Sequence, residues 1–237
     1  MSSYSVADSY AHIKKCRQTY LGPAENSNAN MFLYSAKDDV LSYENVRLNF
    51  AFLKIYDEII VNAIDNKSRA YKSSEHSRID VSFVRVEDEI GISVRNNGAS
   101  IPIEKYKAKP RQDDETDVQY QRRMEEESKH MKKYIPEVLF TVPRSSSNYD
   151  DETAKTRTTG GLNGLGAKLT SIFSSYFEID IVNSGKHYNQ VIRNNCEDIE
   201  EPTIEKSEEN ASASDKHSSD YVEITFVPDW PLVDPTL

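Results

Sequence analysis

The sequence is poor in the residues that mark several common protein classes. Only two of its 237 residues are cysteines, Cys16 and Cys196, which excludes a disulfide framework and suits a reducing compartment. It has no N-terminal apolar segment of the secretory kind and no apolar run of about 18 residues. Neither secretion nor membrane spanning is therefore indicated.

Basic residues are also outnumbered. The chain has 29 Lys and Arg against 39 Asp and Glu, a net charge of −10. An acidic balance argues against this segment binding a nucleic-acid backbone by itself. The acidic balance does not exclude that this segment is part of a DNA enzyme whose basic surface lies elsewhere.

Glycine is scarce as well, yet four of the eight glycines stand at positions 160, 161, 164 and 166. Glycine lets the main chain approach a ligand closely, and a helix predicted over 167–173 would aim its free N–H groups at that ligand. Phosphate is the usual ligand of such a loop. The spacing fits neither the P-loop nor G-x-G-x-x-G, so we predict a phosphate loop of another kind.

Hydrophobic periodicity predicts one long helix and several strands. The helix is expected from about Asn45 to Ala70, and residues 1–45 are expected to form an arm outside the core. We expect an exposed or partly helical insertion over about 107–132, a helix from 134, an acidic mobile loop over about 197–220, and no element after 228. The strands are expected at 79–86, 90–94, 176–182, 187–192 and 221–227.

The long helix carries a polar stripe. Its members are spaced so that they share one side of the helix: Glu58, Asn62, Asp65, Asn66 and Arg69. The apolar residues between them should put the opposite face in the core. A carboxylate there can deprotonate an attacking water, and an Asn oxygen suits Mg²⁺. The alternative is an ordinary amphipathic helix whose stripe meets water.

Two loops could complete a nucleotide site. Asn96-Asn97-Gly98 ends a strand, and Asn side chains offer the donor and acceptor that match a purine edge. The hydroxyls of 145–149 could bind phosphate or ribose. Each loop taken alone is also an ordinary turn or loop.

Together these segments resemble the N-terminal ATPase domain of a eukaryotic-type (type IIA) DNA topoisomerase II. That domain belongs to the GHKL superfamily, which also holds gyrase B, MutL, chaperone ATPases and histidine kinases. The resemblance rests on residues 52–67, on Val94-Arg-Asn-Asn-Gly98, on Ser146-Ser-Asn-Tyr-Asp-Asp151, on the glycine loop and on Thr225-Phe-Val-Pro-Asp229. The superfamily fold it implies is α+β, a two-layer α/β sandwich with helices over a mixed, mostly antiparallel sheet.

The resemblance also implies roles for residues. Glu58 would be the general base for water, and Asn62 would be the Mg²⁺ ligand. The remaining residues assigned to ATP are Asp65, Asn66, Arg69, Asn96, Ser146, Ser147, Asn148, Gly161, Leu162, Asn163, Gly164, Leu165, Gly166, Ala167 and Lys168. Tyr4 or Tyr10 in the arm would reach the partner's nucleotide.

Some positions depart from the family pattern. Ser100 stands where a second glycine is expected, so the turn could differ or the base pocket could be tighter. Leu162 and Leu165 replace residues that are often basic and aromatic, and the insertion over 107–132 is longer than expected. These departures indicate a divergent branch, such as a protist or a large DNA virus.

As a whole, the resemblance implies an ATP-operated gate that forms a homodimer through the N-terminal arm and serves duplex DNA passage, in the nucleus or at a site of viral replication. The transducer domain, with a lysine for the γ-phosphate, and the DNA-cleavage domains would lie outside the 237 residues. This segment should therefore bind ATP and Mg²⁺, hydrolyse ATP slowly, bind DNA weakly and not cleave it. The alternatives are a nucleotide-binding module that has lost catalysis, and a chaperone or MutL-like ATPase.

Overall fold

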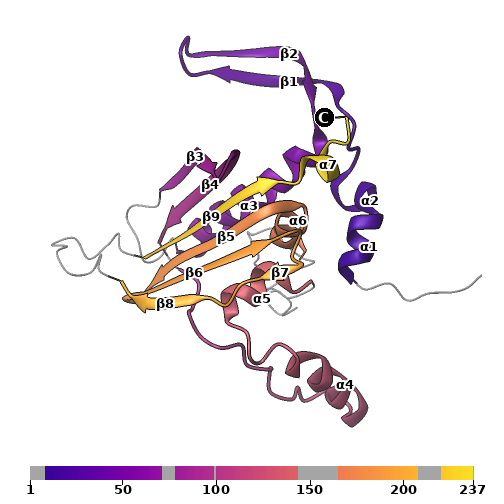
Figure 1. The fold of residues 1–237 in the computed structure, drawn as a ribbon, viewed down its shortest axis with the longest axis vertical. Helices are drawn as coiled ribbons and strands as arrows, with labels where there is room; N and C mark the ends of the chain where they lie inside the picture. Colours follow the sequence, from indigo (N-terminus) through magenta and orange to yellow (C-terminus); the bar gives the residue numbers. More distant parts are fainter. Residues whose placement is uncertain (1–8, 71–77, 99, 144–164, 208–219, 237) are drawn as a thin grey trace, which may run out of the picture.

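Alternating apolar and polar residues form the strands of one antiparallel sheet. The computed structural model describes residues 9–70, 78–98, 100–143, 165–207 and 220–236. The strand order is β3-β4-β9-β5-β6-β7, and β8 pairs with β6 (Figure 1). The strands are β3 (Ile79–Val86), β4 (Glu89–Asn97), β5 (Ser174–Asn183), β6 (Lys186–Arg193), β7 (Asp198–Ile199), β8 (Thr203–Lys206) and β9 (Tyr221–Pro228).

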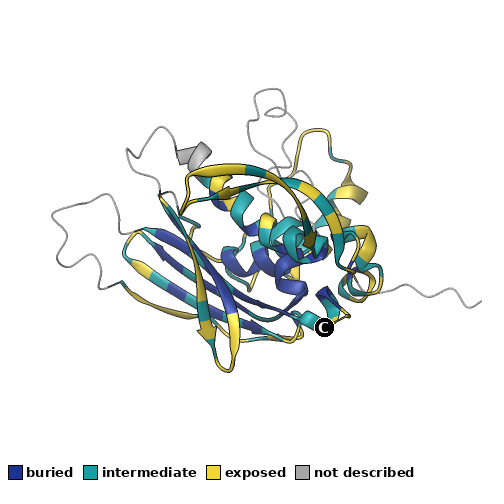
Figure 2. Cartoon of the chain, turned by 90° about the horizontal axis from the view of Figure 1, so that it is seen from above, coloured by how far each residue is buried: buried dark blue, intermediate teal, exposed yellow. Residues whose placement is uncertain are grey.

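Helices cover one face of this sheet. They are α3 (Phe50–Ala70), α5 (Ile135–Thr141) and α6 (Gly166–Ile172). Figure 2 shows the buried residues gathered where helices and sheet meet. The sheet residues Phe177, Ile179 and Phe226 are fully buried members of this core. Two buried hydrogen bonds fasten α6: Thr170 Oγ1 donates to the Ile55 carbonyl (2.7 Å), and Ser171 Oγ donates to the Phe140 carbonyl (2.6 Å). The predicted two-layer α/β sandwich is confirmed.

The long helix differs from its prediction in two ways. It begins at Phe50, because residues up to Leu48 belong to strand β2. The buried side contains Ile55, Ile59 and Ala63, which lie beside the polar stripe and not opposite it, while Ile64 is 48% exposed. The expectation that the opposite face enters the core was therefore wrong. The stripe runs along the border of the core.

The N-terminal segment is more ordered than expected. Helices α1 (Ser9–Lys15) and α2 (Arg17–Leu21) bury Ile13 and Leu21, so part of the expected arm does belong to the core. Strands β1 (Ser27–Ser35) and β2 (Val40–Leu48) then form a separate two-stranded hairpin that projects from the domain (Figure 1).

The segment over 107–132 projects from the side of the domain opposite to the β1–β2 hairpin (Figure 1). It contains α4 (Asp117–Ser128), which starts with a capping box between Thr116 and Gln119 (Figure 1). Arg123 ties the insertion together through Glu115 (2.7 Å) and Glu127 (3.3 Å). Such pairing offsets the low apolar content of the segment.

Two other expectations were wrong. The acidic segment from 197 begins with β7 and β8, which extend the sheet; residues 208–219 of it lie outside the described ranges. The segment after 228 contains the short helix α7 (Trp230–Val233), whose Trp230 packs on Phe52 with ring centroids 5.3 Å apart. No helix in the described ranges has the length and apolarity that crossing a bilayer requires.

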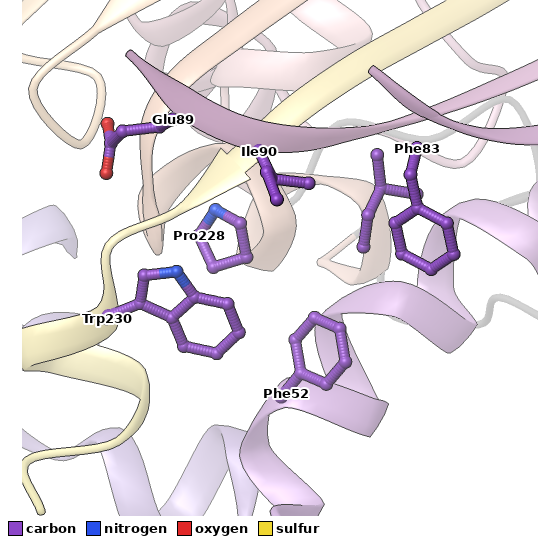
Figure 3. A pocket seen from close by; sticks show the side chains of 7 residues that line it. Phe52, Phe83, Glu89, Ile90, Pro228 and Trp230 are labelled. Carbon is purple, nitrogen blue, oxygen red and sulfur yellow. The ribbon is translucent and has the colours of Figure 1, made fainter. Parts of the chain in front are cut away.

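A mainly apolar cavity of about 500 Å³ lies beside this aromatic pair (Figure 3). Its walls come from the start of α3, the β3–β4 hairpin and the exit of β9: Phe52, Phe83, Glu89, Ile90, Ile92, Pro228 and Trp230. None of the candidate site residues is among them. The cavity is therefore separate from the chemistry predicted for α3 and the glycine loop.

Candidate functional site

The structure brings the stripe on α3 against the end of the glycine loop. Gly166, the first residue of α6, lies so close to Glu58 that a Cβ atom there would overlap the Oε2 atom and stand 2.8 Å from Cδ. With the carboxylate where it stands, a side chain at this position would displace it. The two elements come together because the Thr170–Ile55 hydrogen bond fixes α6 on α3.

The carboxylate of Glu58 is also ion-paired. The Lys54 ammonium contacts Oε1 from one turn earlier on the same helix. Asn62, one turn later and exposed, donates its side-chain N–H to the Glu58 carbonyl, so its Oδ1 is the atom that could bind a cation. In the described ranges no group of three His, Cys, Asp or Glu residues could hold a metal ion. A cation near α3 would therefore have Asn62 Oδ1 as a single neutral protein ligand. Such a site fits Mg²⁺, which keeps several water and phosphate ligands.

Other candidate residues lie deeper. Asp65 is buried on α3, and Asn96 is buried on β4. Asn96 has the same strand parity as Ile92 and Val94, so it points to the helix-covered face of the sheet. Asn66 is half-buried. The side chain of Arg69 lies outside the described part of the chain.

The unexpected serine after the Asn-Asn-Gly turn is accommodated. Gly98 has a φ of 106°, which favours glycine, whereas Ser100 is not among the residues with positive φ. The Ser100 hydroxyl donates to the Tyr221 carbonyl (3.0 Å) and so fastens the turn to β9. The local backbone therefore does not require the second glycine of the family pattern.

Lys168 is the most deeply placed charged residue of the candidate site. Its side chain on α6 is only 3% exposed, and burial lowers its pKa to about 8 from 10.5. Desolvation disfavours the ammonium form, so the folded chain binds this proton less tightly than the unfolded chain does. Near neutral pH the folded state therefore carries a desolvated positive charge.

This burial predicts a pH-dependent change of stability on substitution. Between pH 8 and 10.5 the unfolded chain binds more protons than the folded one, so stability from this group rises with pH and is lost as pH falls through 8. Lys168→Met removes this titration, so its stability relative to wild type should be higher at pH 7 than at pH 10.5 by about 2 kcal/mol. Thermal melts of both proteins from pH 7 to 10.5 should show the wild type gaining stability relative to the variant as the pH rises. A stability difference that does not change over this pH range would contradict this prediction.

Several predicted site residues lie outside the described ranges: Tyr4, Ser146, Ser147, Asn148, Gly161, Leu162, Asn163 and Gly164. Leu165 precedes α6, and Ala167 follows Gly166; both are half-buried. The Tyr10 hydroxyl donates to the Thr141 carbonyl of its own chain.

Sequence reasoning missed Lys54. Its spacing of four residues from Glu58 was a usable signal, because side chains at i and i+4 are neighbours on a helix.

Known proteins resemble this chain in sequence over nearly its whole length. No family model matches the chain. DNA topoisomerase 2 of Candida albicans is 33% identical over 229 residues, which cover 96% of this chain and 13% of that protein. DNA topoisomerase 2 of Saccharomyces cerevisiae is 34% identical over 228 residues, covering 95% and 13%. The chain thus spans about an eighth of the length of these relatives.

Solved structures give the same result. The crystal structure of the ATPase region of Saccharomyces cerevisiae topoisomerase II superposes with a TM-score of 0.74 at 31% identity, over 97% of this chain and 52% of that one. The ATPase and transducer domains of DNA topoisomerase II from Balamuthia mandrillaris give 0.75 at 31% identity, over 99% and 52%. By sequence and by fold, the chain belongs to the family of ATPase regions of eukaryotic-type DNA topoisomerase II.

Proposed function

We propose that this chain is the ATP-binding and ATP-hydrolysing gate module of a type II DNA topoisomerase. The observation that carries the proposal is the contact between Gly166 and the Glu58 carboxylate. It puts the one half-buried carboxylate of the stripe at the end of a glycine loop. A base at that position lies beside the expected γ-phosphate, where it can take a proton from an attacking water.

The surrounding residues support binding. Asn96 would contact the adenine from the helix-covered face of β4, and Lys168 with the backbone of 161–167 would hold the phosphates. Asn62 would hold Mg²⁺, which neutralises phosphate charge when bound. Ser146, Ser147 and Asn148 would contact ribose and phosphates, and Asp65, Asn66 and Arg69 complete the proposed nucleotide site.

The proposal extends to the whole enzyme of which this chain would be a part. Residues 46–237 would form the ATPase domain, and residues 1–45 the arm through which two copies join when ATP binds. The Balamuthia relative contains a transducer domain in addition to its ATPase domain. A comparable domain joined to this chain would supply the lysine for the γ-phosphate, so residues 1–237 alone should turn over slowly. Strand passage of duplex DNA in the nucleus would be the work of the whole enzyme.

Of the alternatives, a module without catalysis is the one that a specific observation motivates, namely Ser100 in place of glycine. The structure weakens that motive, because Ser100 is hydrogen-bonded to β9 without a positive φ. A retained carboxylate packed on Gly166 favours hydrolysis over binding alone.

Calorimetric titration with a non-hydrolysable ATP analogue tests the proposed site. Wild type should bind the analogue with Mg²⁺, and Asn62→Ala should lose most of the Mg²⁺-dependent part of the affinity, about tenfold or more, because it removes the neutral oxygen ligand. Asn189→Ala is the matched control: Asn189 is on β6 with strand parity opposite to that of the buried Tyr188, and its side-chain N–H donates to Glu178 Oε1 (2.7 Å). No binding by wild type, or equal Mg²⁺ dependence in Asn62→Ala, would contradict the assignment.

A further inference from the structure

The two oxygens of the Glu58 carboxylate have different neighbours. Oε1 contacts the ammonium of Lys54, and Oε2 faces the Cα atom of Gly166. The side chain of Glu58 is 19% exposed and that of Lys54 42% exposed, so the pair lies at the border between the core and solvent. One oxygen is thus held by a cation while the other is directed to the end of the glycine loop.

This arrangement restricts the carboxylate from both sides. A glutamate has three rotatable side-chain bonds, and an unrestrained one samples several orientations. The ion pair with Lys54 holds one oxygen by charge attraction, and the 19% exposure of the Glu58 side chain leaves this attraction less screened than that of a fully exposed pair. The backbone at Gly166 leaves no room for the carboxylate to move toward α6, because the Thr170–Ile55 hydrogen bond holds that helix in place.

We propose that Lys54 is a positioning residue for ATP hydrolysis, which directs Oε2 of Glu58 to the water that attacks the γ-phosphate. The inference rests on the proposed function, since it assigns to Lys54 a role in the reaction that Glu58 performs. Lys54 makes no contribution to nucleotide binding in this scheme. It acts on the rate of the chemical step alone.

The spacing of Lys54 and Glu58 also allows a purely structural role. Lys and Glu at i and i+4 on an exposed helix surface stabilise the helix slightly, with no effect on chemistry. The two roles predict different kinetics. Loss of helix stability would lower the melting temperature and the fraction of folded enzyme, whereas loss of positioning lowers kcat and leaves KM for ATP unchanged.

The test uses Lys54→Met, Lys54→Arg, Glu58→Gln and the double variant Lys54→Met/Glu58→Gln in the full-length protein. Single-turnover hydrolysis of radiolabelled ATP gives the rate, and calorimetry with the analogue gives the affinity. Lys54→Met should lower the rate about tenfold or more with affinity within about twofold of wild type, because a small misplacement of a reacting group is costly. Lys54→Arg should recover most of the rate.

The double variant shows whether Lys54 acts through Glu58 or by another route. If Lys54 acts only by orienting that carboxylate, adding Lys54→Met to Glu58→Gln should leave the residual rate unchanged within about twofold. Arg193→Met is the control for loss of a paired cation: Arg193 binds Glu87 (2.9 Å) and Glu200 (3.3 Å), and its strand parity is opposite to that of the buried Tyr188 and Ile192. It should hydrolyse ATP at the wild-type rate.

Two results would overturn the inference. One is a rate for Lys54→Met within about twofold of wild type; the other is an equal fold-loss in the presence and absence of Glu58. Failure of the proposed function has a different signature, because Glu58→Gln itself would then hydrolyse ATP normally or wild type would not bind the analogue.

Discussion

Glu58→Gln should lower the rate of ATP hydrolysis by about two to four orders of magnitude, the contribution typical of a general base. Glutamine has nearly the same shape but cannot accept the proton of the attacking water. Binding of a non-hydrolysable analogue should stay within about twofold of wild type, because the assigned phosphate contacts come from other residues. Single-turnover hydrolysis and calorimetry on the same preparations measure the two effects.

Asp57→Asn is the matched control for this variant. Asp57 is the neighbouring carboxylate on α3 and is exposed. Asp57→Asn removes the same charge from the position directly before Glu58, so a general electrostatic effect on ATP would appear in both variants. Wild-type hydrolysis by Glu58→Gln, or an equal loss in Asp57→Asn, would contradict the assignment of the base.

Gly166→Ala should have the second large effect. The added Cβ would overlap Oε2 of Glu58 and stand 2.8 Å from its Cδ, so the carboxylate has to swing away from the end of the glycine loop. Because the clash is with the tip of a flexible side chain, the fold should survive. The hydrolysis rate should fall about a hundredfold, the cost of displacing a catalytic group by roughly 1 Å.

Glu58→Asp provides the internal control for this clash. The shorter side chain withdraws the carboxylate, so Gly166→Ala should cause little further loss when it is combined with Glu58→Asp. Such non-additivity is expected of two residues in direct contact. Hydrolysis by Gly166→Ala at the wild-type rate, with the fold confirmed by its melting curve, would rule out the contact as a determinant of activity.

Much of the sheet was predictable because its strands have one face in the core. Alternation placed β3 at 79–86, where the structure has it, and placed β5, β6 and β9 to within about two residues of their ends. The β1–β2 hairpin was missed for the opposite reason. Neither of its faces is buried: β1 alternates only between half-buried and exposed positions, and apolar side chains such as Phe32 and Tyr43 lie on the exposed side, so the apolar pattern of the sequence does not follow the strand.

The site was predictable to a different degree. The residue types on α3 and in the glycine loop indicated a site that binds phosphate and Mg²⁺. The resemblance to a family then gave each residue its expected role. The contact of Glu58 with Gly166 could not be read from the sequence, because 108 positions separate them and only the packing of α6 on α3 brings them together. The depth of Lys168 was missed for the same reason, since burial of a lysine is a property of the tertiary fold.

Hydrogen–deuterium exchange, measured with and without the Mg²⁺-bound ATP analogue, tests most directly whether the glycine loop and α3 form one nucleotide site. The predicted result is slower exchange in peptides that cover 159–170, 144–151 and the part of α3 from Glu58 to Asn66, with β6 to β8 unchanged. Binding of the analogue without protection of 159–170, or with protection confined to the cavity beside Trp230, would contradict it.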